Sequence, residues 1–416
     1  MSRLFWISDP DHGILSVMKK KLGIYIHIPF CIRKCDYCDF LSFTSGKEER
    51  ERYAVALKRE IAEGINAGDD SLGSGTGSGK TKDNWLVTSI FFGGGTPSVL
   101  EGEELADILG TVMQSFEVEE DAEITMEANP GTLTPEKLDI CRRAGFNRIS
   151  LGLQSSHNKE LKNLGRIHTW EEFLESFSTA RKAGFHNINV DLMSALPGQT
   201  RESWADTLHK VCALEPEHIS AYSLIIEEGT PFYDRYAHDV QLREEGKACR
   251  LLPSEEEERM MYEDTAAILC AAGYRRYEIS NYAKPGYECR HNTAYWRRQD
   301  YIGFGLGASS LINECRFSNT RQMSSYTAGS KRREEAEYLD TKASMEEFMF
   351  LGLRMCDGIS VSEFEKQFQT GFEKMYGDIT EKLVKDGLLY RKDGWIALTE
   401  RGTDLSNYVM AQYLLD

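Results

Sequence analysis

The chain has 416 residues, of which 66 are acidic and 49 are basic, so its formal net charge is −17. This excess of negative charge disfavours nucleic acid or an anionic membrane as the main partner, because both are bound through cationic patches. No apolar run reaches the about 18 residues of a membrane span, so no transmembrane segment is expected. The length and the apolar share of 41% fit a large α/β barrel with a smaller appended part.

The beginning of the chain, "MSRLFWISDPDHG", has Asp9, Pro10 and Asp11 where a signal peptide needs an apolar stretch. We therefore expect no export and a cytoplasmic location. The ten cysteines are then not expected to form disulfides, because the cytosol keeps thiols reduced. Most of the cysteines that lie apart from one another are expected to be small buried hydrophobic residues; they are Cys141, Cys212, Cys249, Cys270, Cys289, Cys315 and Cys356.

Apolar, strand-like runs alternate with amphipathic helical stretches through the first half of the chain. Strands are expected at 23–28, 88–94, 122–128, 147–154, 187–197 and 218–225, and helices at about 48–66, 101–116, 134–144, 170–183 and 201–214. Alternation of this kind predicts an α/β fold in which a parallel sheet with right-handed crossovers forms a TIM-like barrel, complete or incomplete, of about six units. The related stretches "RRAGFNRIS" and "RKAGFHNIN" each combine a basic last helical turn, a C-cap glycine and the next strand. "CAAGYRRYE" (270–278) repeats the pattern and predicts a further strand.

The remaining segments are less regular. Residues 69–83 predict a surface loop rich in Gly and Ser; the ending Gly79-Lys80-Thr81 lacks the earlier glycine of a phosphate-binding loop, since Ser74 stands there. "SEEEER" (254–259) predicts a helix start. Residues 345–416 follow the plan helix, helix, helix, hairpin, which is typical of a winged helix, and their excess of acids favours packing or partner docking over DNA binding. We thus expect a barrel at 1–250, a linking region at 251–344 and a winged-helix-like module at 345–416.

Three cysteines are close together in "CIRKCDYCDF" (31–40), namely Cys31, Cys35 and Cys38. Structural zinc takes four ligands, usually from two cysteine pairs, and no second pair is visible; His27, in the preceding strand, is a poor fourth ligand. A disulfide framework contradicts the cytosolic location. A [4Fe–4S] cluster held by three thiolates leaves one iron open for another ligand. We therefore expect these cysteines to be the metal ligands of such a cluster.

The spacing Cys-x3-Cys-x-Tyr-Cys directly after the first strand resembles the radical S-adenosylmethionine (SAM) enzymes. The resemblance implies that the open iron chelates the amino and carboxylate groups of SAM, and that an electron from the cluster breaks the sulfonium bond. Polar or glycine-rich groups follow the later strands, where a barrel places its active site. By resemblance, Tyr37 packs near the adenine, and the SAM contacts are Tyr25, Gly94, Gly95, Thr96, Glu127, Gln154, Arg166 and Asp191. The guanidinium of Arg166 suits a carboxylate, while the two acids suit ribose hydroxyls or the ammonium group.

The motifs "HIPFC", "GGGTPS", "MEANPGTL", "ISLGLQS" and "DLMSALPGQT" are similar to those of the oxygen-independent coproporphyrinogen III oxidase family. True oxidases of that family carry a further cysteine two residues after the third and a longer N-terminal segment. Here Asp39 and Phe40 follow Cys38, and the cluster motif begins only 30 residues into the chain. Both departures argue against porphyrinogen decarboxylation.

The segment His291-Asn292-Thr293-Ala294-Tyr295-Trp296 resembles the His-Asn-x-x-Tyr-Trp motif of the HemW-type haem chaperone branch. Imidazole is a common axial haem ligand, and Tyr295 and Trp296 offer flat apolar surface for a porphyrin face. The competing interpretation is a histidine that is simply part of the core. Cys289 is a candidate second ligand.

Three hypotheses remain open from the sequence. The first is a haem-binding transfer protein that carries a [4Fe–4S] cluster and a SAM site and has haem-receiving proteins, and an electron donor, as partners. The second is a coproporphyrinogen oxidase, and the third is another radical SAM enzyme.

Overall fold

The computed structural model describes residues 19–65, 84–329 and 333–415. The expectations about the N-terminal start and about the loop at 69–83 therefore lie outside the described residues. Within the described part, no helix is both long enough and apolar enough to span a membrane.

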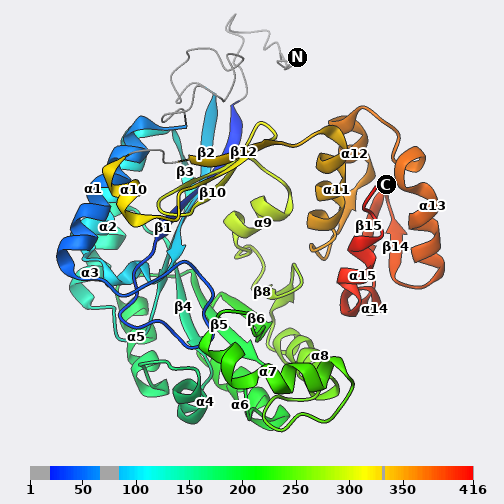
Figure 1. Cartoon of the computed structure of the whole chain (residues 1–416), viewed down its shortest axis with the longest axis horizontal. Coiled ribbons are helices and arrows are strands. Elements are labelled where there is room, and N and C mark those ends of the chain that lie inside the picture. Colours follow the sequence, from blue (N-terminus) through cyan, green and yellow to red (C-terminus); the bar gives the residue numbers. More distant parts are fainter. Residues whose placement is uncertain (1–18, 66–83, 330–332, 416) are drawn as a thin grey trace, which may run out of the picture.

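Six parallel strands form the centre of the molecule, as predicted (Figure 1). They lie side by side in chain order: β1 (Lys20–Ile28), β2 (Trp85–Gly94), β3 (Val118–Ala128), β4 (Arg148–Gln154), β5 (Ile188–Ser194) and β6 (His218–Ser223). The predicted helices are also present, as α1 (Lys47–Glu63), α2 (Gly102–Ser115), α3 (Pro135–Ala144), α5 (Trp170–Lys182) and α6 (Arg201–Cys212). Two short elements lack a sequence prediction, the 3-10 turn η2 (Pro97–Val99) and α4 (Asn158–Asn163).

The barrel is incomplete, because the sheet of the described residues has twelve strands in the open order β12-β11-β10-β9-β1-β2-β3-β4-β5-β6-β8-β7. Beyond β6 come β8 (Asn281–Ala283) and β7 (Arg275–Arg276), the latter within the predicted strand at 270–278. Beyond β1 come β9 (Tyr301–Phe304), β10 (Ser309–Ile312), β11 (Cys315–Asn319) and β12 (Arg333–Tyr338), which the sequence analysis did not predict. Both edges of this sheet are therefore formed by strands from residues 275–338, which follow the six parallel strands in the chain.

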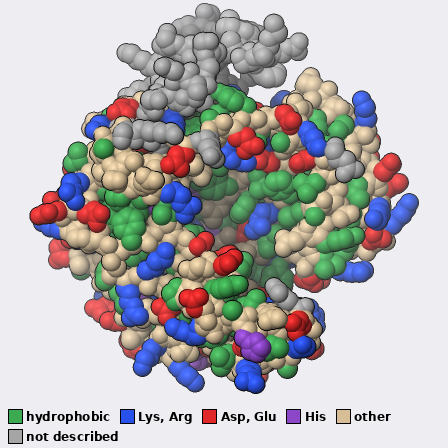
Figure 2. All heavy atoms as spheres, viewed as in Figure 1, with side chains coloured by type: hydrophobic (Ala, Val, Ile, Leu, Met, Phe, Trp, Pro, Cys, Tyr) green, Lys and Arg blue, Asp and Glu red, His purple; other side chains and the backbone are tan. Residues whose placement is uncertain are grey.

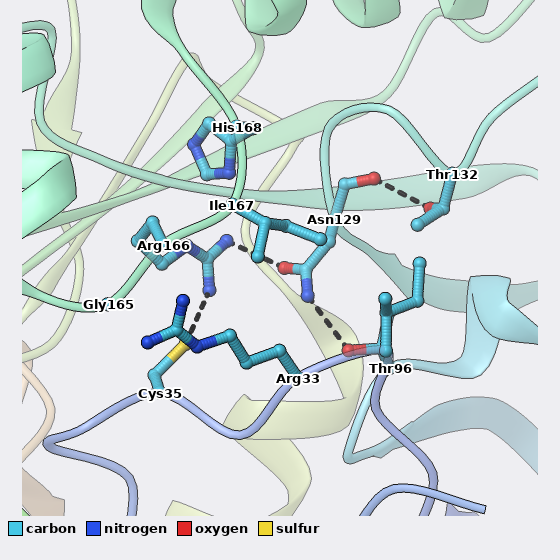
Figure 3. Close-up of a pocket in the computed structure, with 10 residues that line it drawn as sticks. Arg33, Cys35, Thr96, Asn129, Thr132, Gly165, Arg166, Ile167 and His168 are labelled. Carbon is cyan, nitrogen blue, oxygen red and sulfur yellow. Dashed lines mark hydrogen bonds between the residues drawn. The ribbon is translucent and has the colours of Figure 1, made fainter.

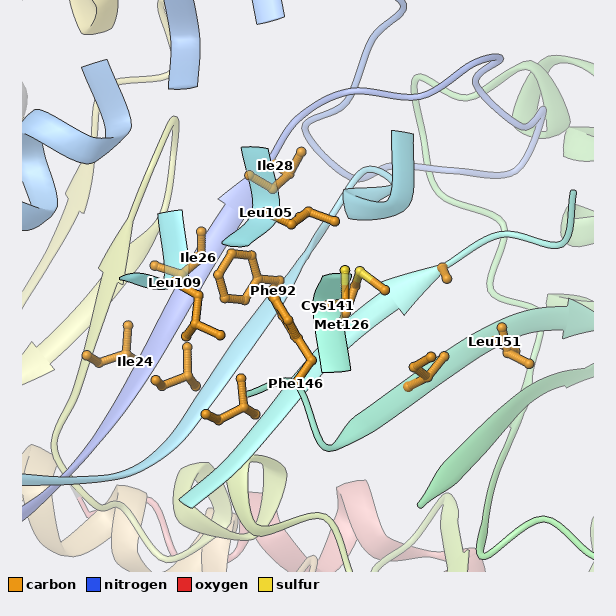
Figure 4. Packing of buried hydrophobic residues seen from close by; sticks show 14 of the residues in the cluster. Ile24, Ile26, Ile28, Phe92, Leu105, Leu109, Met126, Cys141, Phe146 and Leu151 are labelled. Carbon is orange, nitrogen blue, oxygen red and sulfur yellow. The ribbon is translucent and has the colours of Figure 1, made fainter. Parts of the chain in front are cut away.

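Alternation along the strands separates an apolar outer face from a polar inner face. Ile24, Ile26, Phe92, Met126 and Leu151 are buried against the surrounding helices and loops, as Figure 4 shows for part of this core. Burial of such side chains contributes about 1.5–3 kcal/mol each. The residues between them point the other way, which gives the inner face its polar positions, Glu127, Arg148, Ser150, Asn189 and Asp191.

The second half of the chain begins with α7 (Pro231–Glu244) and α8 (Glu255–Ala271). The start of α8 is the one predicted at "SEEEER", where Ser254 and Glu257 form a capping box. Next come α9 (Arg290–Trp296) and α10 (Met323–Ala328). In Figure 1, α9 lies between the parallel strands and the C-terminal part of the chain.

The C-terminal part has its own hydrophobic core, formed by residues between 345 and 415. It contains α11 (Thr341–Gly352), β13 (Ile359–Ser360), α12 (Val361–Phe368), α13 (Phe372–Lys385), β14 (Leu389–Lys392), β15 (Trp395–Leu398), α14 (Glu400–Asp404) and α15 (Ser406–Ala411). The predicted hairpin is present, and its turn residues Asp393 and Gly394 have φ of 51° and 82°, as a tight two-residue hairpin turn requires. The winged-helix assignment stays a prediction.

Candidate functional site

The loop after β1 brings the three clustered thiols to the carboxyl end of the sheet. Its base is closed by two backbone hydrogen bonds, from Cys31 N to Phe43 O (3.0 Å) and from Phe43 N to Pro29 O (2.9 Å). Cys31, Cys35 and Cys38 are all partly exposed and carry free thiols. The loop is thus fixed at its ends while its sulfur atoms remain accessible.

A chain of hydrogen bonds connects two of these thiols through the ends of β2 and β3 and through the connection between α4 (Asn158–Asn163) and α5; Figure 3 shows it from Thr96 to Cys35. Thr96, after β2, donates to Cys31 Sγ (3.6 Å) and accepts from Asn129 Nδ2 (2.8 Å). Asn129, after β3, accepts from Arg166 Nη2 (2.7 Å), and Arg166 Nη1 donates to Cys35 Sγ (3.6 Å). Hydrogen bonds to the sulfur atoms are among the interactions that set the potential of an iron–sulfur cluster.

The donor set fits a cluster better than a single ion. Among the residues that the structure describes, no three Cys, His, Asp or Glu side chains are grouped as one ion requires. A four-iron cluster takes one thiolate on each of three irons and does not need the sulfurs to surround a single point. Three accessible thiols on one loop, two of them accepting hydrogen bonds from a hydroxyl and a cation, match that requirement.

The glycine triplet has a packing role. A Cβ on Gly94, whose φ is +108°, would lie 2.4 Å from the His27 ring, and one on Gly95 would lie 2.7 Å from Phe30 O. The Gly95 amide donates to Ile28 O (2.8 Å). The triplet therefore lets the base of the cysteine loop pack on the end of β2; contact of these glycines with SAM stays a prediction.

Two acids on the inner face have different surroundings. Glu127 accepts from Gly94 N (3.2 Å), and burial, reinforced by the charge of Asp191, raises the pKa of its carboxyl group to about 8. Asp191 accepts from Ser150 Oγ (2.9 Å) and Asn189 Nδ2 (2.8 Å). The carboxyl group of Glu127 is consequently mostly protonated at neutral pH.

Gln154 ends β4 with a φ of 74°, a conformation that is uncommon for residues other than glycine and often found at functional sites. Its Oε1 accepts from the hydroxyl of Tyr222 on β6 (3.4 Å). Tyr37 of the cysteine loop packs on Phe232, with 6.2 Å between ring centroids. Burial raises the pKa of the Tyr37 hydroxyl, and the charge of Arg166 opposes that rise, so Tyr37, Arg166 and Cys35 share one environment.

His291 is buried, with 2% of its surface exposed, and both ring nitrogens have partners. Nδ1 lies 2.9 Å from Ser89 Oγ, and Nε2 lies 3.0 Å from Tyr295 Oη. Its ring stacks on Phe91, 5.1 Å between centroids. Burial, followed by the charge of Arg148, lowers the pKa of His291 to about 3, so the ring is neutral at physiological pH.

One cavity of about 190 Å³ joins residues from the two predicted sites. Tyr25, Glu127 and Asp191 line it from the strands, and His291, Asn292 and Tyr295 line it from α9. Of the other predicted site residues, Thr96 and Arg166 donate to thiols and Tyr37 lies in the cysteine loop, whereas Gly94, Gly95 and Gln154 lie at the ends of β2 and β4. Residues that the sequence analysis missed are Asn129, Arg148, Ser150 and Tyr222; the alternation of polar and apolar residues along β4 and β5 could have indicated those on the inner face.

Comparisons with known proteins agree with this arrangement. The Radical SAM superfamily model matches residues 25–211, and the HemN C-terminal domain model matches residues 339–405. "Heme chaperone HemW" of Lactococcus lactis subsp. lactis is 36% identical over 96% of this chain and 99% of its own length, and that of Escherichia coli is 33% identical over 95% and 98%.

Among solved structures, coproporphyrinogen III oxidase (HemN) from Escherichia coli matches with a TM-score of 0.76 at 23% identity, over 95% of this chain and 90% of that one, which supports the radical SAM fold. The superfamily implies a [4Fe–4S] cluster and SAM as cofactors, and the thiol loop supplies ligands that suit such a cluster. On the strength of its near full-length relatives, the chain belongs to the heme chaperone HemW family of radical SAM proteins.

Proposed function

We propose that this protein binds haem and delivers it to other proteins, and that it does so while carrying a [4Fe–4S] cluster and a SAM site. The observation that carries the proposal is the shared cavity, in which His291, Asn292 and Tyr295 of the haem-chaperone motif face Tyr25, Glu127 and Asp191. The names of the relatives support the same function.

In this proposal His291 is the axial ligand of the haem iron. Its neutral ring is the form that ligates a metal, but Nε2 is within hydrogen-bonding distance of the Tyr295 hydroxyl. The cavity of about 190 Å³ is also smaller than the about 300–1,000 Å³ of pockets for drug-sized ligands. Haem binding at His291 therefore requires α9 to move away from β2 and Tyr295 to release the ring.

Cys31, Cys35 and Cys38 hold the cluster in this proposal, and Thr96 and Arg166 orient and polarise two of the sulfur atoms. When bound, the cluster supplies one electron at a time. The thiols must remain reduced to act as ligands, which favours a cytoplasmic setting. Haem-receiving proteins and an electron donor are the expected partners.

The test is an anaerobic titration of the full, reconstituted chain with haem, followed by the Soret band. The wild type is expected to shift the band, and His291→Ala to weaken binding by at least about tenfold, which corresponds to the loss of one coordinating bond of modest strength. Tyr295→Phe is the matched control: it keeps the ring but removes the competing hydroxyl, so it should bind haem at least as tightly as the wild type.

The oxidase hypothesis is tested in parallel by incubating the same preparation with SAM, a reductant and coproporphyrinogen. Accumulation of protoporphyrinogen would contradict the proposed function. Haem binding by His291→Ala that equals the wild type would show that this residue is not the ligand.

A further inference from the structure

Arg148, the first residue of β4, is a buried cation in the wall of the cavity that Tyr25, Glu127, Asp191 and His291 line. Only 2% of its surface is exposed. Its Nε has no hydrogen-bond partner among the described residues, and the guanidinium makes no ion pair within that part of the chain. A charge in such a position is costly unless another group neutralises it.

The neighbouring acids do not fill this role. Arg148 feels the charges of Glu123 and Asp191 through space, but both carboxylates are bound by other donors. Glu123 accepts from the backbone N–H groups of Arg290 (3.0 Å) and His291 (3.1 Å) at the start of α9. Asp191 accepts from Ser150 and Asn189. The N–H groups of the Arg148 guanidinium are thus available to donate hydrogen bonds to a group that enters the cavity.

The cavity suits one arm of a ligand and not a whole tetrapyrrole. Its volume of about 190 Å³ is too small for a large ring system, and the stacked rings of Tyr25 and Phe91, 6.4 Å apart between centroids, provide an apolar wall. The planar fork of a guanidinium matches the two oxygens of a carboxylate. Glu127, whose carboxyl is mostly protonated at neutral pH, adds little repulsion against such a group.

We infer that Arg148 is the anchor for a carboxylate of the ligand that occupies this cavity. Two ligands of this protein carry the required group: SAM, through its amino-acid end, and a porphyrin, through its propionates. The porphyrin source rests on the proposed function, whereas the SAM source does not.

The experiment compares each ligand with an analogue that lacks the carboxylate charge. The full, anaerobically reconstituted chain is titrated with haem and haem dimethyl ester, and with SAM and decarboxylated SAM. Arg148→Gln is expected to weaken binding of either haem or SAM about 10- to 100-fold, the range of a charge-assisted hydrogen bond. Binding of the corresponding analogue, which lacks the carboxylate charge, should be unchanged. The pair that shows the selective loss identifies the source.

Arg181→Gln is the matched control, because Arg181 is paired with Glu217 (2.7 Å) outside the cavity; it should bind all four ligands as the wild type does. Arg148→Lys keeps the positive charge but not the planar guanidinium, and it replaces Arg148→Gln in the test if that variant does not fold. It should weaken binding of the same carboxylate ligand by a smaller factor and leave binding of the analogue unchanged.

Equal binding of all four ligands by the wild type and the folded Arg148 variant would overturn the inference. An equal loss of affinity for a ligand and for its analogue without the carboxylate charge would also overturn it, because such a loss indicates a disturbed cavity. A wild type that does not bind haem would defeat the proposed function alone, and the SAM pair would then decide the role of Arg148.

Discussion

Asn129 illustrates how one side chain between two others can organise a site. Its amide donates to Thr96 and accepts from Arg166, and each of these residues in turn donates to a thiol. The sequence motif "MEANPGTL" contains Asn129 directly after β3, yet residue spacing alone does not show which strand ends meet. The thiols, by contrast, could be assigned from spacing, because a chain that forms no disulfides rarely clusters three cysteines outside a metal site.

Glu127 should make the stability of the chain depend on pH in a defined direction. Its pKa in the folded chain is raised from 4.5 to about 8, so between these values the folded chain binds a proton that the unfolded chain has released. The free energy of unfolding therefore falls as pH rises through this window. In Glu127→Gln this contribution is absent, and the variant should gain stability relative to the wild type between pH 5 and pH 8, by up to about 4 kcal/mol.

The measurement is urea unfolding of the cluster-free wild type and Glu127→Gln at pH 5 and pH 8. Glu120→Gln, an exposed acid on the same strand, serves as the control and should follow the wild type at both values. A stability difference between wild type and Glu127→Gln that does not change with pH would contradict the raised pKa.

Substitution of Cys35 and of Cys141 should distinguish a thiol that binds the cluster from a thiol that packs in the hydrophobic core. Cys35 is partly exposed and contacts Arg166, whereas Cys141 is fully buried in the core beside α2 and β3. Cys35→Ala is expected to abolish cluster assembly and leave the melting temperature of the cluster-free chain unchanged. Cys141→Ala should retain the cluster and lower the free energy of unfolding by about 1 kcal/mol.

Iron per chain after anaerobic reconstitution and the circular dichroism melting curve check both variants. Full iron loading of Cys35→Ala, or collapse of its far-ultraviolet spectrum, would contradict the cluster assignment or its independence from folding.

Among the helices and strands, the long ones with a periodic pattern can be predicted from the sequence, whereas the short ones cannot. The six parallel strands and the helices between them carry long periodic patterns, and the structure confirms them to within a few residues. Strands β9 to β12 have four to six residues each, and α9 has seven; runs of this length hold too little periodicity to be distinguished from loops. Their position depends on pairing with β1 and on packing against β2, which are contacts between segments far apart in the sequence.

The junction between β1 and β2 should tolerate no side chain at Gly95. A Cβ there would lie 2.7 Å from Phe30 O and 2.8 Å from Phe30 N, both backbone atoms that cannot rotate away. Gly95→Ala is therefore expected to displace the segment that leads into the cysteine loop, to lower the free energy of unfolding by about 1–3 kcal/mol and to reduce cluster loading.

Gly110→Ala provides the opposite case, because Gly110 lies inside α2 with no atom within 4 Å of its added methyl group. This control should raise the free energy of unfolding by up to about 1 kcal/mol and leave cluster loading unchanged. Wild-type iron content in Gly95→Ala would show that the close packing of β1 and β2 does not position the thiols.

For the molecule as a whole, the end of α9 is in direct contact with the C-terminal part of the chain. Arg297 donates to Gly358 O (2.7 Å), and the guanidinium of Arg354 lies 4.3 Å from the Trp296 ring centroid. On the face seen in Figure 2 the molecule is hollowed between the parallel strands and the C-terminal part. The division of the chain into domains at residues 250 and 344 stays a prediction. These contacts nevertheless mean that a movement of α9 would have to break or shift its contacts with the C-terminal part.

Arg298 should be the strongest of these links. Only 2% of its side chain is exposed, and it donates to Glu347 (2.8 Å), to Glu314 (3.0 Å) and to Ser344 (3.1 Å). Arg298→Gln removes the buried cation that Glu347 and Glu314 share, while Arg316 (2.7 Å) stays paired with Glu347. Breaking a buried ion pair costs about 3–5 kcal/mol, and the remaining Arg316 pair places the expected loss at the lower end of this range. We expect the variant to unfold at lower urea concentration and its C-terminal part to be released faster by limited proteolysis. Arg391→Gln, which removes an exposed pair with Glu373 inside the C-terminal part, should cost less than about 1 kcal/mol.

If haem binding requires α9 to move, Arg298→Gln should also bind haem faster than the wild type. An unchanged association rate would show that the C-terminal part does not restrain α9.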